Sequence, residues 1–511
     1  MKLPITRTLS TALPVTRTLS IAMILPLSGL VLCLLLLSNA LAQAQGAQFE
    51  PPEIKFTSSL TPVGSGARAL GMGGAFIAFA DDATAASWNP AGLKHLLRPE
   101  MSIVGYYDDR REGFSFSDSP GASNHYQVSG EYLNYLSMTY PFRWINRNFI
   151  FSLNYQNLYS LRRRMHFLYH YENLNEPLPI SMDYEVTYRQ KGNLKAISPA
   201  IATFVAGKLS FGLTLNFWSD KLFDNGWVED YSRSGRGTVG NVTDRNETAG
   251  NGTVGTGMDE TVTVGTGMDG NGTVETEGFA YESYREKKDR YSFSGFNVNY
   301  GFLWDISPVF TIGAVVKTPF TARIRHEGKS LSHQVWPDDP ALGGISYDPP
   351  QHDEQKLGMP LSYGIGLAVR PLDQLIFDLD ITRTEWNGYV LHDRTGQRID
   401  PITGLPKEQS PIEPTHQVRL GGEYVFLHKG MTLSPRLGLF YDPEPASKKP
   451  DDFYGFSLGL GVTLGRIAPV AIDMAYQYRF GTNVEGDSIM GENSPADVRQ
   501  HLFYHSVIYY F

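Results

Sequence analysis

The sequence predicts an all-β protein, a transmembrane antiparallel β-barrel of about 14 strands. Three observations predict this fold. After one N-terminal apolar run, the chain has no second apolar stretch long enough to cross a bilayer as a helix, so spanning would fall to strands. Segments of about ten residues carry an apolar residue at every second position. The connections between these segments alternate between short and long.

The N-terminal run is typical of a secretory signal peptide. Basic residues precede an apolar run from Ile21 to Leu37, and the small-residue sequence Ala40-Leu41-Ala42 follows. We therefore expect residues 1–42 to be removed on export, with a retained inner-membrane anchor as the alternative. The single cysteine, Cys33, lies in this run. A mature chain would then have no thiol for a disulfide, a nucleophile or a metal site.

The alternation of apolar and small residues assigns a lipid face and a lumen face to each expected strand. In residues 361–370 and 454–464 the alternation has no errors. Side chains along a strand alternate between its two faces, so assigning the residues of one face also assigns those of the other. The residues expected to face lipid are Tyr363, Leu367, Phe456 and Leu460. Those expected to face the lumen include Gly364 and Gly459.

The spacing of these segments predicts an even number of strands, as single-chain bacterial barrels have. The strands are expected to begin near Met101, Glu131, Asn148, Gly192, Lys208, Tyr291, Val309, Pro360, Asp373, Thr415, Met431, Asp452, Ala468 and Arg499. The long connections are expected at 108–130, 161–190, 219–290, 318–359, 383–414 and 481–498. Outer-membrane barrels have short periplasmic turns and long outer loops, so both ends of the barrel chain are expected to face the periplasm.

One long connection has a low-complexity sequence. Val-Gly-Thr-Gly-Met-Asp occurs at Val254 and again at Val264, within a Gly/Thr/Asp-rich stretch at 232–278. Such composition cannot bury a core, so we expect a disordered outer-loop insertion. The formal net charge of -9 leaves no basic footprint for the whole chain, and nucleic acid is not an expected partner.

Two motifs after the expected signal peptide resemble a known family. The sequence Gly66-Ala-Arg-Ala-Leu-Gly-Met-Gly-Gly-Ala75 leads on to Trp88-Asn-Pro-Ala-Gly-Leu93. This opening resembles the N-terminal plug of the FadL-type outer-membrane transporters for long-chain fatty acids and other hydrophobic compounds. The resemblance continues at 361–371, 418–424, 435–443 and 473–481. Outer-membrane proteins of type IX secretion share a similar opening, so a secretion or structural role is the alternative.

The resemblance implies a barrel (expected residues 99–511) whose lumen is closed by an N-terminal hatch (expected residues 45–98). Its hatch motif matches Asn89, Pro90 and Ala91, and the expected hatch glycines are Gly71, Gly73 and Gly74. It further implies that a hydrophobic ligand is captured at the outer loops, reaches an interior site and leaves sideways through an opening made by a kink in the third strand. Residues 155–161, where that kink is expected, contain neither Gly nor Pro.

The resemblance also implies the protein's partners and location. The expected partners are a hydrophobic small molecule, such as a fatty acid or a hydrocarbon, and the lipid of the outer membrane. The chain ends on a strand with alternating apolar residues and a terminal Phe511. Such an ending resembles the signal that is read by the barrel-assembly machinery, which is therefore a further expected partner.

Four residues are candidates for ligand binding. Phe76 and Phe79 would contact the apolar part of a ligand. Arg419 and Arg436 fall on the lumen face, where they would either form ion pairs that join the wall to the hatch or bind a ligand carboxylate, since an arginine fork suits that anion.

Chemistry at an active site is not expected. The sequence contains no serine elbow, zinc-ligand spacing or isolated His/Asp/Ser set, and we therefore expect neither an enzyme nor a metal or cofactor. A dinucleotide-like pattern at 64–69 lacks the strand, helix and parallel sheet that such a site needs.

Overall fold

The computed structural model describes residues 61–62, 64–115, 123–173, 180–206, 208–239, 279–337, 343–393, 395–410, 412–447, 449–465, 469–484 and 495–511. The expected signal peptide, the expected hatch before Thr61 and residues 240–278 of the repetitive connection lie outside the described residues.

The described strands form one closed antiparallel sheet. It contains 21 labelled strands, and the pairing of β2 (Glu100–Phe114) with β21 (Ala496–Tyr510) closes the circle. The others around the barrel are β3 (Asn124–Trp144), β4 (Arg147–Asn173), β5 (Ile180–Ala206), β6 (Leu209–Trp218), β7 (Gly226–Val239), β8 (Phe279–Asp305), β9 (Phe310–Lys317), β10 (Phe320–Val335), β11 (Gly344–Met359), β12 (Ser362–Leu372), β13 (Leu375–Thr384), β16 (Thr415–Tyr424), β17 (Phe426–His428), β18 (Met431–Tyr441), β19 (Phe453–Leu464) and β20 (Val470–Val484).

Several labelled strands continue one another along a single barrel strand. Strands β6 and β7 both pair with β5 and β8, and β9 and β10 both pair with β8. The same holds for β11 with β12 and for β16 with β17. Counted in this way, the barrel has 14 strands, which confirms the expected architecture. The short strands β14 (Val390–His392) and β15 (Arg398–Ile399) lie in the connection between β13 and β16.

The expected strand faces are confirmed. Tyr363, Leu367, Phe456 and Leu460 are exposed on the outside of the barrel, where a membrane barrel presents apolar side chains to lipid. Hairpin turns at one end are tight, as between β3 and β4, where Ile145 and Asn146 both have positive φ. This two-residue geometry matches the twist of the flanking strands.

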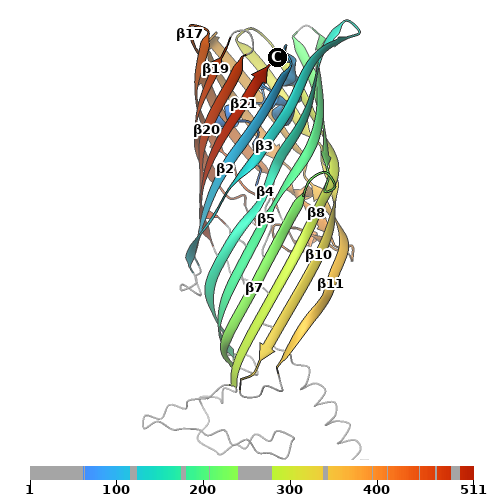
Figure 1. The fold of residues 1–511 in the computed structure, drawn as a ribbon, viewed down its shortest axis with the longest axis vertical. Helices are drawn as coiled ribbons and strands as arrows, with labels where there is room; N and C mark the ends of the chain where they lie inside the picture. Colours follow the sequence, from blue (N-terminus) through green and yellow to red (C-terminus); the bar gives the residue numbers. More distant parts are fainter. Residues whose placement is uncertain are drawn as a thin grey trace, which may run out of the picture. The chain divides into compact units, whose positions relative to one another are not determined.

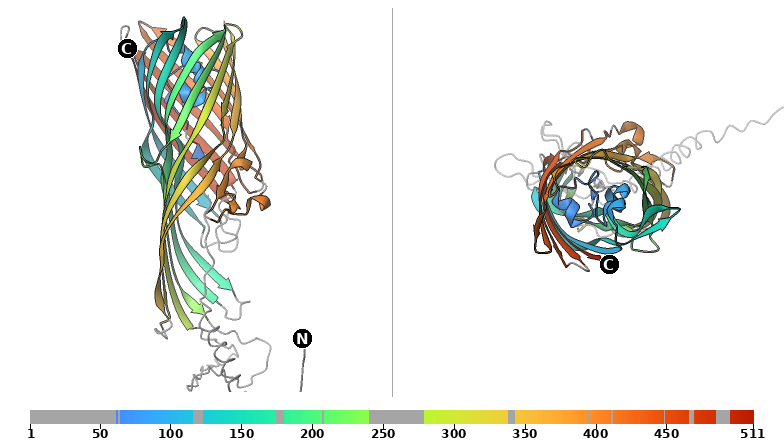
Figure 2. Two further views of the ribbon diagram at one scale, coloured as in Figure 1. Left: turned by 90° about the vertical axis from the view of Figure 1, so that its right-hand side faces the viewer. Right: turned by 90° about the horizontal axis from the view of Figure 1, so that it is seen from above.

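The long connections differ from the prediction. Six strands continue far past the rest of the barrel as a sheet on one side, which we call the outer sheet: β4, β5, β7, β8, β10 and β11 (Figures 1 and 2). Much of 161–190 and 318–359 is therefore strand, and residues 232–239 belong to β7 rather than to a loop. The sequence pattern missed these extensions because alternation marks only the part of a strand that meets lipid, whereas backbone pairing continues beyond it.

A compact segment lies inside the barrel. Residues 64–96, which we call the hatch segment, contain α2 (Ala67–Gly71), α3 (Ala85–Trp88) and the 3-10 helix η1 (Pro90–His95). The view along the barrel shows this segment within the lumen (Figure 2). Helix α2 contacts β18 to β21, and η1 contacts β5, β6 and β8 on another side. Among the described residues, no helix has the length and apolar character needed to cross a membrane.

Candidate functional site

Asn89 joins the hatch segment to the barrel wall. Its side-chain Nδ2 donates to the carbonyl oxygens of Ile77 (2.8 Å) in the hatch segment and Phe302 (3.0 Å) in β8. Its Oδ1 accepts from the backbone N–H of Ala91 (3.1 Å), which caps η1, and Pro90 occupies the first turn, where its missing N–H costs nothing. The expected hatch motif is therefore buried where the hatch segment contacts the wall, and Asn89 forms hydrogen bonds to both.

The expected hatch glycines lie against the opposite wall. A Cβ added to Gly71 would stand 2.9 Å from the Cα of Gly459, and one on Gly74 would stand 2.7 Å from the guanidinium of Arg419. Gly73 has a φ of 71°, which side chains rarely adopt. These positions keep the turn after α2 close to β16, β18 and β19.

The wall carries matching glycines that the sequence analysis did not single out. A Cβ on Gly301 would reach Asn89 Oδ1 at 2.2 Å, and one on Gly438 would reach the backbone nitrogen of Gly73 at 2.1 Å. The same close approach to the hatch segment occurs at Gly212, Gly313, Gly366 and Gly421. Their lumen-facing position within alternating strands is the sequence signal that could have identified them.

Polar wall side chains hold residues 70–77 of the hatch segment. Asp380 accepts from the backbone N–H groups of Phe76 (2.6 Å) and Ile77 (2.8 Å). Gln477 donates to the Leu70 carbonyl (2.9 Å) and Ser457 to the Gly71 carbonyl (3.0 Å). These backbone groups of the hatch segment are thus satisfied by side chains of the wall.

Arg436 belongs to a buried network of charges. Its guanidinium contacts Glu423 at 2.5 Å and Asp473 at 2.6 Å, and its side chain is 4% exposed. Glu423 also pairs with Arg68 of the hatch segment (2.8 Å), which in turn pairs with Asp81 (2.6 Å). With two carboxylate partners and no place in the cavity lining, Arg436 matches the first of its two expected roles, joining wall to hatch.

The two candidate phenylalanines pack inside the hatch segment. Phe76 and Phe79 are both buried, with ring centroids 5.9 Å apart in an edge-to-face arrangement, and Phe76 also contacts the Trp88 ring at 6.4 Å. Neither lines the cavity described next, whereas Trp88 does. On the hatch side, the aromatic contact with the cavity therefore comes from Trp88, next to the hatch motif.

A cavity of about 210 Å³ lies between the hatch segment and the wall. Its hatch side includes Gly64, Ser65, Leu70, Gly74, Ile77, Ser87 and Trp88. The apolar part of its wall includes Leu158, Tyr159, Trp218, Phe320, Met359 and Trp386. The polar part includes Asn216, Asn299, Lys317, Thr382, Gln417 and Arg419. An apolar lining with a few converging polar groups is the usual form of a small-molecule site.

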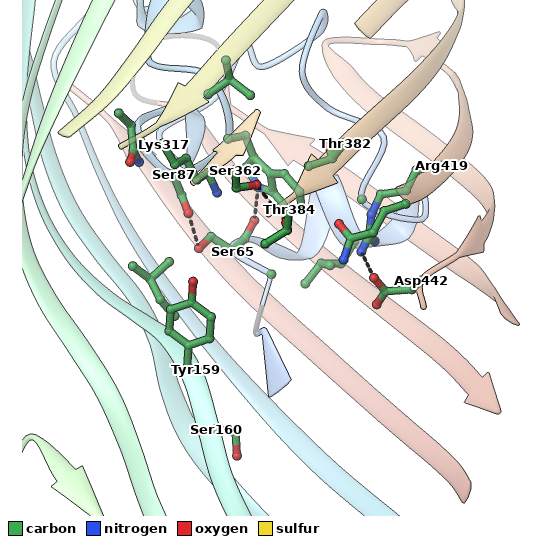
Figure 3. A pocket seen from close by; sticks show the side chains of 18 of the residues that line it. Ser65, Ser87, Tyr159, Ser160, Lys317, Ser362, Thr382, Thr384, Arg419 and Asp442 are labelled. Carbon is green, nitrogen blue, oxygen red and sulfur yellow. Dashed lines mark hydrogen bonds and ion pairs between the residues drawn. The ribbon is translucent and has the colours of Figure 1, made fainter. Parts of the chain in front are cut away.

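Three cations line the cavity, namely Arg419, Lys317 and Arg479, and Arg479 pairs with Asp442 and Glu444. Arg419 donates from NH1 to the Gly73 carbonyl (2.9 Å), and its NH2 lies 3.1 Å from Asp442 Oδ1 (Figure 3). Lys317, at the end of β9, has no carboxylate partner in the part of the chain that the structure describes, and the charged group that acts on it is Arg419. An unpaired ammonium in such a cavity is available to an anionic ligand. Sequence analysis missed Lys317 because it examined only the later strands for lumen-facing charges.

The wall is interrupted beside this cavity. Strands β3 and β4 pair only from Trp144↔Arg147 to Tyr135↔Gln156. Beyond that point β3 continues to pair with β2 as far as Asn124, and β4 continues with β5 as far as Asn173. We call this interruption in the hydrogen-bond ladder the wall gap. The β4·β5 register shifts between Asn157 and Tyr159, so the third barrel strand is irregular at the expected place without Gly or Pro.

The start of the hatch segment and the short strand before it contact the two sides of the wall gap. Strand β1 (Thr61–Pro62) pairs with β4 at Ser160 and Tyr159. On the other side, Asn134 of β3 donates to the Gly64 carbonyl (2.9 Å) and accepts from the Gly66 N–H (3.2 Å). Tyr159 and Ser160 also line the cavity (Figure 3).

An arginine of β4 bridges the far end of the wall gap. Arg162 donates to the Tyr106 hydroxyl (2.8 Å) of β2, and its guanidinium lies 3.5 Å from the centre of the Tyr132 ring of β3. A cation over an aromatic face is an attractive contact. The wall gap is therefore bounded by the Tyr135–Gln156 pair at one end and by Arg162 at the other.

The comparisons with known proteins give a likeness in fold. No protein-family model matches the chain, and no curated protein matches it. Among solved structures, the chain resembles a FadL homologue of Pseudomonas aeruginosa with a TM-score of 0.53 and 14% identity, over 89% of this chain and 100% of that one. The chain has the fold of a FadL homologue.

Two further matches are toluene transporters. TodX of Pseudomonas putida aligns with a TM-score of 0.48 and 13% identity, over 88% of this chain and 99% of that chain. TbuX of Ralstonia pickettii aligns with a TM-score of 0.45 and 15% identity, over 88% and 98%.

Within this FadL-like barrel, the structure divides the expected site residues into three groups. Asn89, Pro90, Ala91 and the three glycines form the hatch–wall contact. Arg419 lines the cavity together with Lys317. Arg436, Phe76 and Phe79 lie outside the cavity lining and serve the packing and charge network of the hatch segment.

Proposed function

We propose that this protein takes up hydrophobic small molecules across an outer membrane. The observation that carries the proposal is the cavity that joins the hatch segment to the wall gap through Tyr159 and Ser160. The FadL-like fold supports it. A ligand captured at the outer loops would reach this cavity, and the hatch segment, held on several sides by the wall, would block the straight path through the lumen. The wall gap would then let the ligand leave sideways into lipid.

The lining suggests an amphipathic ligand with a carboxylate, such as a long-chain fatty acid. Trp218, Phe320 and Trp386 would contact its apolar chain, and Lys317 with Arg419 would balance its charge. A carboxylate moved into an apolar cavity needs such a counter-charge, because burial of an unpaired anion is costly. A neutral hydrocarbon would use the apolar wall alone.

The proposed location is the outer membrane of a cell, reached by export and insertion of the barrel. The barrel-assembly machinery and outer-membrane lipid are then partners in biogenesis and residence, and the proposed activity is transport rather than catalysis. The apolar outer surface of the barrel supports membrane residence.

Binding of two ligands of equal chain length, one a fatty acid and one a neutral alkane, tests this proposal. The purified protein should bind both, and Lys317→Gln should weaken fatty-acid binding about tenfold or more, the scale of one charge-assisted hydrogen bond, while changing alkane binding little. Arg419→Ala should act in the same direction. Arg143→Gln, an exposed cation at the β3–β4 turn, is the control and should change neither.

Equal losses for both ligands would mean that the two cations stabilise the wall and do not contact the ligand. Uptake assays in cells address the secretion alternative. If cells without the protein take up every lipophile at the normal rate while failing to export a surface protein, transport is the wrong function.

A further inference from the structure

The outward face of the outer sheet is rich in cations. Exposed outward-facing residues of β4, β5, β8, β10 and β11 form what we call the basic face: Arg164, Arg189, Lys191, Lys288, Arg323, Lys329 and Lys356. Carboxylates share this face, among them Asp183, Glu185, Asp230, Glu286, Glu327 and Glu354.

Like charges stand directly opposite one another on this face. The cross-strand register places Arg164 beside Arg189, Lys288 beside Lys329, and Arg323 beside Lys356. Like charges directly opposite on neighbouring strands destabilise a sheet. Three such pairs in one sheet are expected where an anion binds between them.

Most of these cations have no carboxylate partner. Among the described residues, ion pairs are found for Lys288, with Glu286 at 3.3 Å, and for neither member of the Arg164–Arg189 and Arg323–Lys356 pairs. Neighbouring cations do have partners, since Arg290 lies 2.9 Å from Asp224 and Arg325 pairs with Asp220. Asp230 stands opposite Arg189 and Lys288 in the register, so the Arg323–Lys356 pair is the one whose two members both lack an ion pair and whose flanking position on β8 is uncharged, at Ser294, among the described residues.

The basic face begins where the lipid-facing rows end. On β8 the exposed apolar side chains run outward as Trp304, Phe302, Tyr300 and Phe296. Two residues beyond Phe296, Ser294 pairs with Arg323, whose other neighbour is Lys356. The Arg323–Lys356 pair is therefore level with the edge of the apolar band, where lipid headgroups would lie.

We propose that the basic face binds the phosphate groups of lipids in the surrounding leaflet. Guanidinium and ammonium groups suit phosphate oxygens, and the arginine fork binds them in pairs. A lipid headgroup fits the observations better than a protein partner because the Arg323–Lys356 pair is level with the edge of the apolar band. The inference needs the barrel to sit in a membrane, as in the proposed function, but it does not depend on the transported ligand.

Lipid titration of the purified full-length protein tests the proposal. Binding of phosphatidylglycerol, counted by native mass spectrometry, is compared with that of phosphatidylcholine. Arg323→Gln with Lys356→Gln should lower the affinity for phosphatidylglycerol on the order of tenfold, following the usual contribution of cations near an anionic surface, and leave phosphatidylcholine unchanged. The control is Arg236→Gln with Arg398→Gln, which removes two exposed cations that already pair with Glu282 and Glu408.

Thermal midpoints in nanodiscs give a second readout. The parent should gain stability from phosphatidylglycerol and the Arg323/Lys356 variant should not, whereas in phosphatidylcholine the variant should be at least as stable because its like-charge repulsion is gone. Equal responses of both variants to phosphatidylglycerol would overturn the proposal. It would also fail if inorganic phosphate at the same concentration stabilised the parent as well as the lipid does, since the site would then take a free anion. Either failure leaves cavity binding, and so the proposed uptake, untouched.

Discussion

At the scale of single residues, the hatch segment depends on a few side chains that satisfy backbone groups across a buried contact. Asn89 makes three such hydrogen bonds, to Ile77, Phe302 and Ala91. Removal of one partner from a buried pair costs about 1–3 kcal/mol, because the other group is left without hydrogen bonds. One amide side chain therefore controls how firmly η1 and the turn at Ile77 are held.

Replacing Asn89 with leucine should loosen the hatch segment. The carbonyl groups of Ile77 and Phe302 would lose their donor, and influx of hydrophilic solutes through the barrel should rise severalfold. Influx of a chromogenic solute into protein-loaded liposomes measures this. Asn148→Leu, at an exposed position of β4, is the control and should leave influx unchanged. Influx at the parent level in both variants would show that Asn89 does not hold the hatch.

Much of this residue-scale detail was predictable from the sequence, but only through local motifs. Asn89, Pro90 and Ala91 are contiguous, and the family resemblance marked them as a hatch motif. The choice between a wall partner and a ligand for Arg419 and Arg436 depends on which carboxylates lie nearby in space. Asp473, which holds Arg436, is 37 residues away in the chain. Sequence spacing alone cannot make that distinction.

At the scale of elements, the barrel wall is shaped to fit the hatch segment. Wall glycines on β6, β8, β9, β12, β16, β18 and β19 leave room for its backbone. Strand alternation predicted the side on which such residues lie, as it did for Gly364 and Gly459. It could not predict the outer sheet, where charged side chains replace the apolar rows that meet the lipid tails.

Gly438→Ala should disturb hatch docking. Its Cβ would stand 2.1 Å from the backbone nitrogen of Gly73, a contact that only a shift of strand or hatch relieves. Amide hydrogen exchange in residues 66–80 should become faster by at least severalfold. Gly344→Ala is the matched control, because its Cβ would meet nothing within 4 Å. Similar exchange in the two variants would contradict the close fit of hatch and wall.

A histidine joins three strands of the outer sheet, beyond the lipid-facing rows. His326 of β10 contacts Asp353 of β11 through Nδ1 (2.6 Å) and Asp289 of β8 through Nε2 (2.7 Å). Both ring nitrogens face carboxylates, so the arrangement favours the imidazolium, which donates from both. Burial lowers the pKa of His326, but the hydrogen bonds with Asp289 and Asp353 outweigh it and leave the pKa raised.

The contacts of His326 with Asp289 and Asp353 should make the thermal stability of the protein depend on pH. Because the folded pKa of His326 is raised, its contribution is fully present below the unfolded pKa of about 6.5 and is lost as pH rises through the folded value. The thermal midpoint of the parent should therefore fall as the pH rises from about 6.5 through the pKa of His326 in the folded protein. His326→Gln should show a smaller fall. Parallel curves for parent and variant would mean that another group causes the dependence.

At the scale of the whole molecule, the hatch segment, the cavity and the wall gap lie next to one another within the barrel. The hatch segment lies within the lumen, the cavity lies between it and the wall, and the wall gap adjoins the cavity at β4. The sequence predicted the barrel and its strand count because alternation repeats along every strand. It could not locate the wall gap, since no Gly or Pro marks the irregular register at Asn157–Tyr159 and only the pairing of β3 and β4 reveals where they part.

Closing the wall gap tests the central claim most directly. With Cys33 changed to serine, Tyr132→Cys and Arg162→Cys place thiols on β3 and β4 at positions whose side chains meet across the wall gap, since the Arg162 guanidinium lies 3.5 Å from the centre of the Tyr132 ring. A short bifunctional thiol reagent that bridges them should abolish uptake of a fatty acid, and a cleavable version should restore it on cleavage. The control bridges Met138 and Leu153, which face each other where the same strands are paired, and should leave uptake normal. Normal uptake with the gap bridged would contradict sideways passage through the wall.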